Sequence, residues 1–435
     1  MEQEELKRKL MGLWERTTHN SKEALSILFD YYFDLNYIEY KEIEGKVVSA
    51  LCGIPYYFGS GKKQLKGLYL LSLSSEEGFR KKGILAELLN NFNERIKDEF
   101  DFSFIVPHTD LLADYYGTQG YLSSFFILEE RFTPLHDFKN DYFLSLSDSD
   151  ERIRNLKIAL FNDINVTDYK EDPLFDKAQL INFIEGIEKK VTSSVNLIHG
   201  TKDLDYLLSD QSLGNLNIFV SSDADGRITG VAFTQKEDIK RTKVVATYIE
   251  DTCSYYVLLD FIKRKYFDHS LSIDTYDSRY QIHSIIQQTY AAANPAGGDL
   301  DNTFETIEIS FNLNKLLHPL GMVKFLRFEH ILDYVASTRS DVEFKLHIRD
   351  YCPCDMVNDQ KIGCNDKEDC KLLFTVKNGE CKIEKYENLP PDRSILNLSE
   401  KEISELLLRK NDSSNLIMEA FGIPRLDLQM QLLPY

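Results

Sequence analysis

The stretch from Leu68 to Ile96 constrains the fold of this chain most strongly, because it joins a buried strand to an amphipathic helix through a basic turn. An almost wholly apolar run from Leu68 to Leu73 predicts a strand that is buried on both faces. After Gly83, apolar residues recur at helical spacing and predict a helix. A helix N-terminus presents free backbone N–H groups and the positive end of the helix dipole, so this arrangement favours a phosphate group.

The turn before this helix contains Arg80, Lys81 and Lys82 and ends at Gly83. Glycine has no Cβ, so a pyrophosphate could approach the backbone closely at this position. An ordinary strand–helix corner with a basic surface loop would have the same sequence pattern. The turn alone therefore leaves both a phosphate site and a plain corner open.

The composition favours two or three globular domains. A chain of 435 residues is too long for one ordinary core, and its apolar content of 43% is sufficient to fill several. Lysine and arginine number 51 against 70 acidic residues, which gives a net charge of −19. This balance argues against nucleic acid and anionic membrane surfaces and favours cationic partners such as amines. A requirement for solubility alone would explain the charge equally well.

The sequence carries no sign of export or of a membrane partner. The first residues, Met1 to Glu5, are acidic rather than typical of a secretion signal. No apolar run reaches the length of about 18 residues that suggests a membrane span. We therefore expect a cytoplasmic protein whose seven cysteines are thiols.

The elements before residue 140 are predicted to be two helices, a hairpin, the strand and helix described above, a second strand and a last helix. Ser21 is the expected cap of the second helix. The hairpin covers 37–54, and the second strand runs from Phe102 to Val106. The loop from Gly59 to Lys63 resembles a P-loop only superficially, because Tyr56 stands where that motif requires its first glycine.

Residues 145–320 repeat part of this order, with a hairpin, a strand, a helix from Ser254 to Phe267 and a further strand. The turn before that helix, Glu250 to Ser254, contains neither a glycine nor a basic residue. A pyrophosphate would meet acidic side chains there. We predict a related fold that lacks the phosphate site.

The C-terminal residues predict a smaller unit of a sheet and helices. Asn378-Gly379 is typical of a hairpin turn, and Ser399 and Glu402 have the spacing of a capping box. The chain ends in an apolar segment from Leu426 to Tyr435, which predicts an extended and docked terminus.

Two motifs resemble those of the GNAT acyl-CoA N-acetyltransferases. The turn from Arg80 to Gly83 is similar to the Q/R-x-x-G-x-G/A turn that cradles the coenzyme A pyrophosphate in that family. The segment YGTQGY from Tyr116 to Tyr121 matches the family ending Y-x-x-x-G-[YF]. Leu85 departs from the pattern, since glycine or alanine is usual at its position.

The whole chain resembles the Eis-like acetyltransferases, in which two GNAT domains precede a sterol-carrier-protein-like domain. This resemblance implies an α/β (α+β) fold with mixed sheets and three domains, at 1–140, 141–322 and 323–435. The first domain would be the catalytic one, and the second would lack the cofactor turn. The resemblance also implies a homo-oligomer, which is a hexamer in that family.

The resemblance further implies which residues bind acetyl-CoA, the cosubstrate. In GNAT enzymes the strand that carries the turn splays from its neighbour, and the thioester lies in the gap between the two strands. The residues implied to bind acetyl-CoA are Leu71, Ser72, Leu73, Arg80, Lys81, Lys82, Gly83, Ile84 and Leu85. No metal is expected.

For catalysis the resemblance implies Tyr116 as the acid that protonates the leaving thiolate. A phenol with a reference pKa near 10 is protonated at neutral pH and can donate its proton. Tyr115 is the alternative acid. In Eis-like proteins the terminal carboxylate, here that of Tyr435, accepts the proton of the amine. An apolar C-terminus could equally be an ordinary docked strand.

Other candidate residues carry weaker signals. Asp30, Asp34 and Glu39 lie in the region expected to face a cationic amine. Four cysteines within one 19-residue window could bind zinc, but they lack paired C-x2-C spacing, so free thiols are the alternative. These cysteines are Cys352, Cys354, Cys364 and Cys370.

Two functions follow as hypotheses. The first is an acetyl-CoA-dependent N-acetyltransferase that acts on a primary amine of a cationic small molecule, of aminoglycoside, polyamine or lysine type. The second is a non-catalytic protein that binds an apolar ligand in the sterol-carrier-like module and uses the GNAT halves as scaffold. The cofactor turn, present in one half and absent from the other, favours the enzyme.

Overall fold

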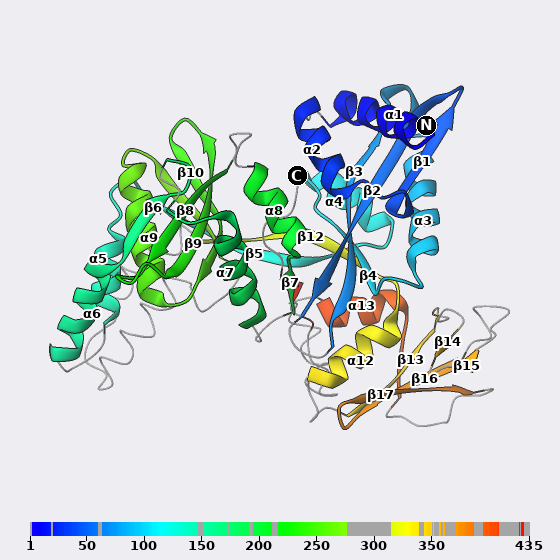
Figure 1. The fold of residues 1–435 in the computed structure, drawn as a ribbon. Helices are drawn as coiled ribbons and strands as arrows, with labels where there is room; N and C mark the ends of the chain where they lie inside the picture. Colours follow the sequence, from blue (N-terminus) through cyan, green and yellow to red (C-terminus); the bar gives the residue numbers. More distant parts are fainter. Residues whose placement is uncertain are drawn as a thin grey trace.

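The computed structural model describes residues 2–18, 21–59, 63–146, 151–171, 174–190, 195–210, 216–275, 315–338, 343–349, 351, 356–357, 360–361, 371–386, 395–408, 426 and 428–429. Within these residues, helices lie on both faces of a long mixed sheet, and a smaller sheet lies beside it (Figure 1). The predicted mixed α/β class is confirmed. No helix among the described residues is long and apolar enough to cross a membrane.

The first half of the chain places helices on both faces of its part of the sheet. Its elements are α1 (Glu2–Thr17), α2 (Lys22–Tyr32), η1 (Leu35–Tyr37), β1 (Ile38–Ile43), β2 (Lys46–Phe58), β3 (Leu65–Ser75), η2 (Glu77–Phe79), α3 (Ile84–Ile96), β4 (Phe102–Ile105), α4 (Asp110–Thr118) and β5 (Leu122–Phe132). Ser21 caps α2 as predicted, because its Oγ accepts the N–H of Ala24 at 3.1 Å. The predicted hairpin is β1 and β2, which pair antiparallel.

Alternate side chains of β3 divide the core into two layers. Leu70 packs with α3 and α4, in a cluster that includes Leu89 and Tyr116. Leu71 packs on the opposite face with α1 and α2, in a cluster that includes Trp14. This alternation is the period of two expected of a strand, and it makes β3 the central strand of the half.

The second half repeats the arrangement of strand, helix and parallel strand. Its elements are α5 (Phe138–Ser145), α6 (Glu151–Asp163), β6 (Asn165–Asp168), α7 (Lys177–Lys190), β7 (Val195–Ile198), α8 (Thr201–Asp210), β8 (Leu216–Ser222), β9 (Ile228–Asp238), β10 (Arg241–Ile249), α9 (Thr252–Lys265), β11 (Ser270–Thr275) and β12 (Lys315–Phe325). Strand β10 pairs parallel with β11, with α9 as the connection, as β3 and β4 do through α3.

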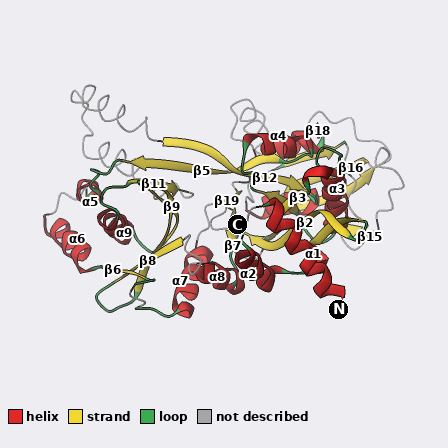
Figure 2. Cartoon of the chain, turned by 90° about the horizontal axis from the view of Figure 1, so that it is seen from above, coloured by secondary structure: helices red, strands yellow, loops and turns green. Residues whose placement is uncertain are grey.

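Strand β12 links the halves, because it lies in the sheet of the first half. It pairs antiparallel with β4 on one side and with β5 on the other. Strand β5 then pairs with β11, so one sheet continues through both halves (Figure 2). Within the described residues this sheet has thirteen strands. The expected domain boundary between 322 and 323 falls inside β12.

A second link is made by β7 and α8, which belong to the second half in sequence. Strand β7 pairs with the end of β2 at Tyr57 and Phe58. Helix α8 packs against α2 of the first half, at the junction between the two halves (Figure 1). Residues from 195–210 therefore lie beside the first half.

The C-terminal part contains a separate sheet of the order β17-β16-β13-β18, whereas β14 and β15 pair with each other and β19 joins the long sheet. The following elements make up this part of the chain: α12 (Phe328–Thr338), β13 (Phe344–Ile348), β14 (Met356–Val357), β15 (Gln360–Lys361), β16 (Lys371–Lys377), β17 (Glu380–Tyr386), β18 (Ile395–Leu398), α13 (Glu400–Leu408) and β19 (Leu428–Gln429). Asn378 and Gly379 form the predicted hairpin turn, both at positive φ. Ser399 and Glu402 form the predicted capping box, with reciprocal bonds of 3.2 and 2.7 Å.

Candidate active site

The candidate site lies where β3 loses its neighbour β4. The two strands pair in parallel from Gly67 and Phe102 to Leu70 and Ile105. Strand β4 ends there, whereas β3 continues to Ser75. Past Leu70, none of the described strands pairs with the edge of β3 that faces β4. Free backbone groups at such an opening can bind an extended ligand arm.

A β-bulge lies at this opening. Leu71 is opposite Cys52 and Ser74 is opposite Ala50, so β3 has one more residue than β2 between these pairs. Ser72 has a φ of 55°, an uncommon value for a residue other than glycine. Bulges re-aim backbone groups and are frequent next to active sites. The sequence did not predict the bulge, because the residues around Ser72 read as an ordinary strand.

The basic turn leads from β3 to an uncapped helix N-terminus. Gly83, the N-cap of α3, has a φ of 79° and makes no side-chain cap. A Cβ at Gly83 would meet no atom within 4 Å, so the space above the backbone is open. Arg80, Lys81 and Lys82 are exposed, and Arg80 Nε donates to the carbonyl of Ser75 at 3.1 Å. The turn therefore presents positive charge and free N–H groups together.

Glu76 fixes the start of this turn to the rest of the half. Its carboxylate accepts from Lys46 Nζ at 2.9 Å and from Arg16 Nε at 2.9 Å. Burial alone would raise the pKa of Glu76, but the hydrogen bonds from Lys46 and Arg16 outweigh it and lower the pKa. The ionised carboxylate thus binds α1 and β2 to the base of the turn.

Tyr116 lies in the last turn of α4, next to the opening. It packs in the same cluster as Leu70 and Ile105, the last paired residues of β3 and β4. Gly120, at a φ of 87°, ends the helix and allows the N–H of Tyr121 to donate to the carbonyl of Tyr116 at 3.1 Å. The Y-x-x-x-G-Y motif is therefore a helix end that holds Tyr116 in place.

The hydroxyl groups of Tyr116 and Tyr121 differ in their surroundings. The Tyr121 hydroxyl lies 2.8 Å from Ser103 Oγ and accepts from Asn93 Nδ2 at 3.1 Å. Among the described residues, Tyr116 has no hydrogen-bond partner for its hydroxyl. Burial, followed by the proximity of Tyr115 and Tyr121, raises the pKa of Tyr116. Tyr116 is therefore protonated at neutral pH.

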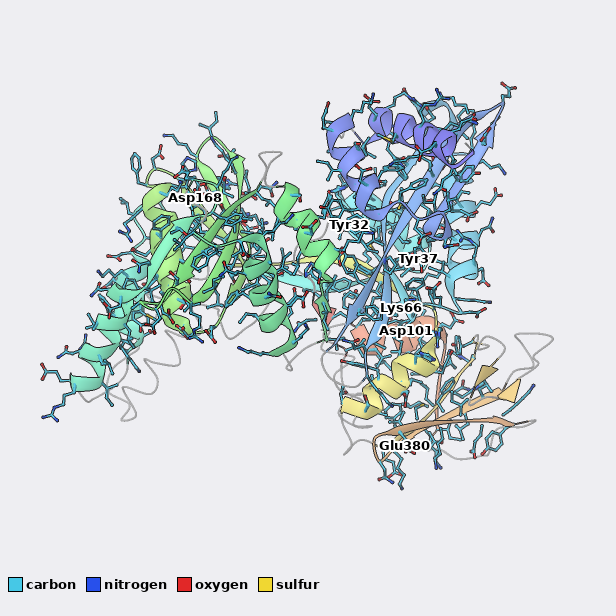
Figure 3. The ribbon with its side chains drawn as sticks, viewed as in Figure 1. Tyr32, Tyr37, Lys66, Asp101, Asp168 and Glu380 are labelled. Carbon is cyan, nitrogen blue, oxygen red and sulfur yellow. The ribbon has the colours of Figure 1, made fainter. Side chains whose placement is uncertain are left out.

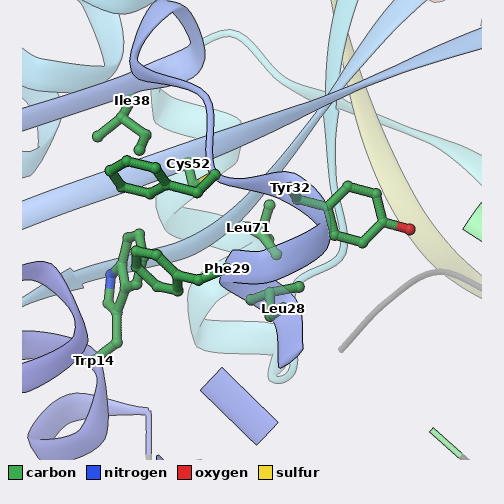
Figure 4. A pocket seen from close by; sticks show the side chains of 8 residues that line it. Trp14, Leu28, Phe29, Tyr32, Ile38, Cys52 and Leu71 are labelled. Carbon is green, nitrogen blue, oxygen red and sulfur yellow. The ribbon is translucent and has the colours of Figure 1, made fainter. Parts of the chain in front are cut away.

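A small apolar cavity lies on the opposite face of the sheet, against Leu71. It encloses about 10 Å³, close to the smallest volume that holds one water. Its walls are Trp14, Leu28, Phe29, Tyr32, Phe33, Ile38, Cys52 and Leu71 (Figure 4). Burial raises the pKa of the Cys52 thiol to about 12, so this side chain is uncharged where it lines the cavity.

The three acids suggested for amine binding are engaged elsewhere. Asp30 forms an ion pair with Lys7 at 3.1 Å, and Glu39 forms one with Arg95 at 2.9 Å. The Asp34 side chain accepts the N–H of Asn36 and caps η1. None of the three lines the apolar cavity.

The remaining predicted residues lie outside the described part of the chain. These are Tyr435 and the four cysteines Cys352, Cys354, Cys364 and Cys370. Strand β19 pairs with β7, which pairs with β2, so Gln429 lies beside the first half. Tyr435 follows six positions later in the sequence. Its role as proton acceptor stays a prediction.

The second half has the opening and the bulge but not the phosphate turn. Strand β10 pairs with β11 only as far as Val244 and carries one extra residue, Val245, against β9. The N-terminus of α9 is occupied, because Asp251 accepts the N–H of Ser254 at 2.9 Å. A phosphate would have to displace this carboxylate and would be repelled by it.

Comparisons with known proteins agree with this architecture. No family model and no curated protein matches the sequence. Among solved structures, the chain is similar to a conserved protein of unknown function and probable N-acyltransferase from Enterococcus faecalis V583. That match has 12% identity and a TM-score of 0.61, over 95% of this chain and 90% of the other.

Two further structures match over nearly the whole length. A GCN5-related N-acetyltransferase from Anabaena variabilis has 12% identity and a TM-score of 0.58, over 97% of this chain and 96% of the other. Eis1 from Mycobacterium abscessus has 8% identity and a TM-score of 0.54, over 92% and 90%. At these identities the comparison establishes the fold. The chain thus has the fold of the GCN5-related N-acetyltransferases.

Proposed function

We propose that the protein is an acetyl-CoA-dependent N-acetyltransferase that acts on a primary amine. One observation carries the proposal: the opened and bulged strand β3 leads directly to an uncapped, basic helix N-terminus in the first half. The second half retains the opening and has lost the free helix N-terminus. Retention of the whole combination in one half is expected if that half binds the cosubstrate.

The residues present fit acetyl-CoA, which supplies the acetyl thioester. Backbone groups of Leu71, Ser72 and Leu73 lie at the unpaired edge of β3 and would bind the extended arm. The turn and the first residues of α3 would hold the pyrophosphate. These residues are Arg80, Lys81, Lys82, Gly83, Ile84 and Leu85. The open space above Gly83 is consistent with close approach of an anion.

Tyr116 is proposed as the general acid. It packs beside the last paired residues of β3 and β4, and its hydroxyl donates to no described group. As the amine nitrogen forms its bond to the acetyl carbon, the C–S bond breaks and the Tyr116 proton passes to the departing sulfur. The nitrogen releases one proton to water or to the terminal carboxylate predicted from the sequence, and Tyr116 regains its proton from water. Such proton transfer contributes about 10²–10⁴-fold to a rate.

The amine would approach from the face of the sheet opposite to α3. Leu71 belongs to that face, and α1 and α2 cover it. The net charge of −19 favours a cationic acceptor over an anionic one. The finer likeness, to Eis-like enzymes with a sterol-carrier-like domain, rests on the order of the elements and on the match to Eis1.

The experiment is a thiol-release assay with acetyl-CoA and four amines: putrescine, kanamycin, 2-phenylethylamine and Nα-acetyl-lysine. Thiol release that depends on one or more of these amines, with the N-acetylated product found by mass spectrometry, is the expected result. Binding of acetyl-CoA without release in any mixture would remove these amines as acceptors. Neither binding nor release would overturn the proposed function.

A further inference from the structure

A buried carboxylate of the second half is hydrogen-bonded to a tyrosine of helix α2 in the first half. Asp203 lies in the first turn of α8, and its Oδ1 accepts the hydroxyl proton of Tyr32 at 2.9 Å. Tyr32 belongs to α2 and lines the apolar cavity together with Leu71 (Figure 4). We propose that Asp203, through the hydroxyl of Tyr32, holds the ammonium group of the acceptor. This inference rests on the proposed function.

The Asp203 carboxylate is held rigidly. Its Oδ2 accepts the backbone N–H of Gly200 at 2.9 Å, while Oδ1 is bound to Tyr32. Asp203 is 9% exposed. A carboxylate has about four lone-pair positions, so two remain for further donors. A fixed and partly desolvated anion binds a cation more strongly than a mobile surface carboxylate does.

The hydroxyl of Tyr56 is a second observation that points to a ligand here. Tyr56 is 1% exposed, and its hydroxyl lies near that of Tyr32 but makes no hydrogen bond of good geometry among the described residues. Burial foremost, and then the nearby Asp203 and Tyr32, raise the pKa of Tyr56. A buried hydroxyl without a partner costs free energy, which a bound donor would offset.

Among the described residues, one cation lies near the Asp203–Tyr32 pair, since Lys202 Nζ is 5.8 Å from the centre of the Tyr32 ring, and the other neighbours are neutral or bound to another group. Burial foremost, and then Asp203, raise the pKa of Tyr32, so both tyrosines are neutral. The neighbouring His199 is tied to Glu188, which accepts its backbone N–H at 2.9 Å and lies 2.6 Å from its Nδ1. An ammonium N–H can donate to the oxygen of Tyr32 while Tyr32 donates to Asp203. This chain of charge-assisted hydrogen bonds selects a cation.

The contact between α2 and α8 also contains a residue that serves as a matched control. Asp205 lies two residues after Asp203 in the same helix. It accepts a hydrogen bond from the hydroxyl of Tyr31 and forms an ion pair with Lys177 at 2.6 Å. Its side chain is 41% exposed, and neither Tyr31 nor Asp205 lines the cavity. Asp205 thus makes a tyrosine–carboxylate pair between the same two helices, but its tyrosine is outside the cavity lining. Figure 3 shows Tyr32 at this junction between the halves.

The test uses the full chain and the panel amine with the highest kcat/KM. Asp203→Asn should raise the KM for that amine about tenfold or more, as expected for loss of one charge-assisted contact, and leave the KM for acetyl-CoA nearly unchanged. Asp203→Glu should restore part of the affinity, and Asp205→Asn should behave as the wild type. An unchanged amine KM in Asp203→Asn, or equal effects of both Asn variants, would overturn the inference.

Tyr32→Phe keeps the inference testable if Asp203→Asn does not fold. It retains the ring, which packs edge-on against Tyr206 at 5.3 Å between ring centres, and removes only the hydroxyl that donates to Asp203. The amine KM should rise as in Asp203→Asn, and an unchanged value contradicts the inference. An inactive wild type would instead refute the proposed function, so the two failures are distinguishable.

Discussion

At the scale of single residues, two tyrosines five positions apart have different duties. The hydroxyl of Tyr121 is bound to Ser103 and Asn93, so this residue fixes β4 and α3 to the start of β5. The hydroxyl of Tyr116 has no described partner, and burial raises its pKa. Tyr121 therefore has a structural role, and the hydroxyl of Tyr116 is available as a proton donor.

Tyr116→Phe should lower kcat by about 10²-fold or more, because the leaving sulfur loses its proton donor, while the Kd for acetyl-CoA is nearly unchanged. Tyr121→Phe is the control, and it should lower stability by about 1–3 kcal/mol because two buried groups lose a partner. Steady-state kinetics and thermal unfolding measure both effects. Full activity of Tyr116→Phe would exclude it as the acid.

Asp274 predicts a pH dependence of stability. Burial raises the pKa of Asp274 from 3.8 to about 6, although Lys243 lies 3.0 Å away and opposes the shift. The folded state therefore binds this proton more tightly than the unfolded state, so the ionised group destabilises the fold, by about 3 kcal/mol for two pKa units. Its cost is absent below about pH 4 and complete above about pH 6.

Asp274→Asn should therefore gain stability relative to the wild type as the pH rises. The difference in free energy of unfolding between variant and wild type should be about 2–3 kcal/mol more favourable at pH 7 than at pH 4. Urea unfolding at both pH values measures it. A difference that does not change with pH would contradict this assignment.

Among the elements, helices α3 and α9 follow similar strands but differ in how their N-termini are capped. Both helices follow an opened and bulged strand. Gly83 leaves the N-terminus of α3 free, whereas Asp251 fills that of α9 with its own carboxylate. The sequence predicted this contrast because caps and turns are set by neighbouring residues.

Asp251→Ala should lower the stability of the protein by about 0.5–2 kcal/mol, because the first turn of α9 loses its cap. It should leave the affinity for acetyl-CoA unchanged, since α9 belongs to the half without the phosphate turn. Thermal unfolding with and without acetyl-CoA measures both quantities. If acetyl-CoA no longer stabilised this variant, the cosubstrate would bind in the second half, contrary to the proposal.

Local signals predicted the elements well, and the departures from them are non-local. Hairpin turns such as Asn378-Gly379 and the cap at Ser21 depend on a few adjacent residues. The bulge at Ser72 depends on how β3 is aligned with β2, and neighbouring residues in the sequence do not determine that register. The pairing of Tyr32 with Asp203 joins residues 171 positions apart and had no local signal at all.

At the scale of the whole molecule, the two halves are interleaved rather than strung in series. Strand β12 completes the sheet of the first half between β4 and β5, and β7 extends it beyond β2. The order of the elements in the sequence therefore does not show where the strands of one half end and those of the other begin. Long-range strand exchange of this kind leaves no pattern in composition or periodicity.

A fragment of residues 1–140 should fail to fold cooperatively, because removal of β12 separates β4 from β5 and opens the core. Circular dichroism and thermal unfolding of the purified fragment measure this. Cooperative unfolding of the isolated fragment would show that the first half does not need β12.

We propose that the first half alone binds acetyl-CoA, at the opened strand and the Gly83 turn. Isothermal titration of acetyl-CoA into the wild type, Gly83→Glu and Gly226→Glu tests it most directly. Gly226 is the matched control, with a φ of 78° and no atom within 4 Å of a Cβ, in the turn before β9. We predict one site per chain in the wild type and in Gly226→Glu, and none in Gly83→Glu. Two sites per chain, or undiminished binding by Gly83→Glu, would contradict the claim.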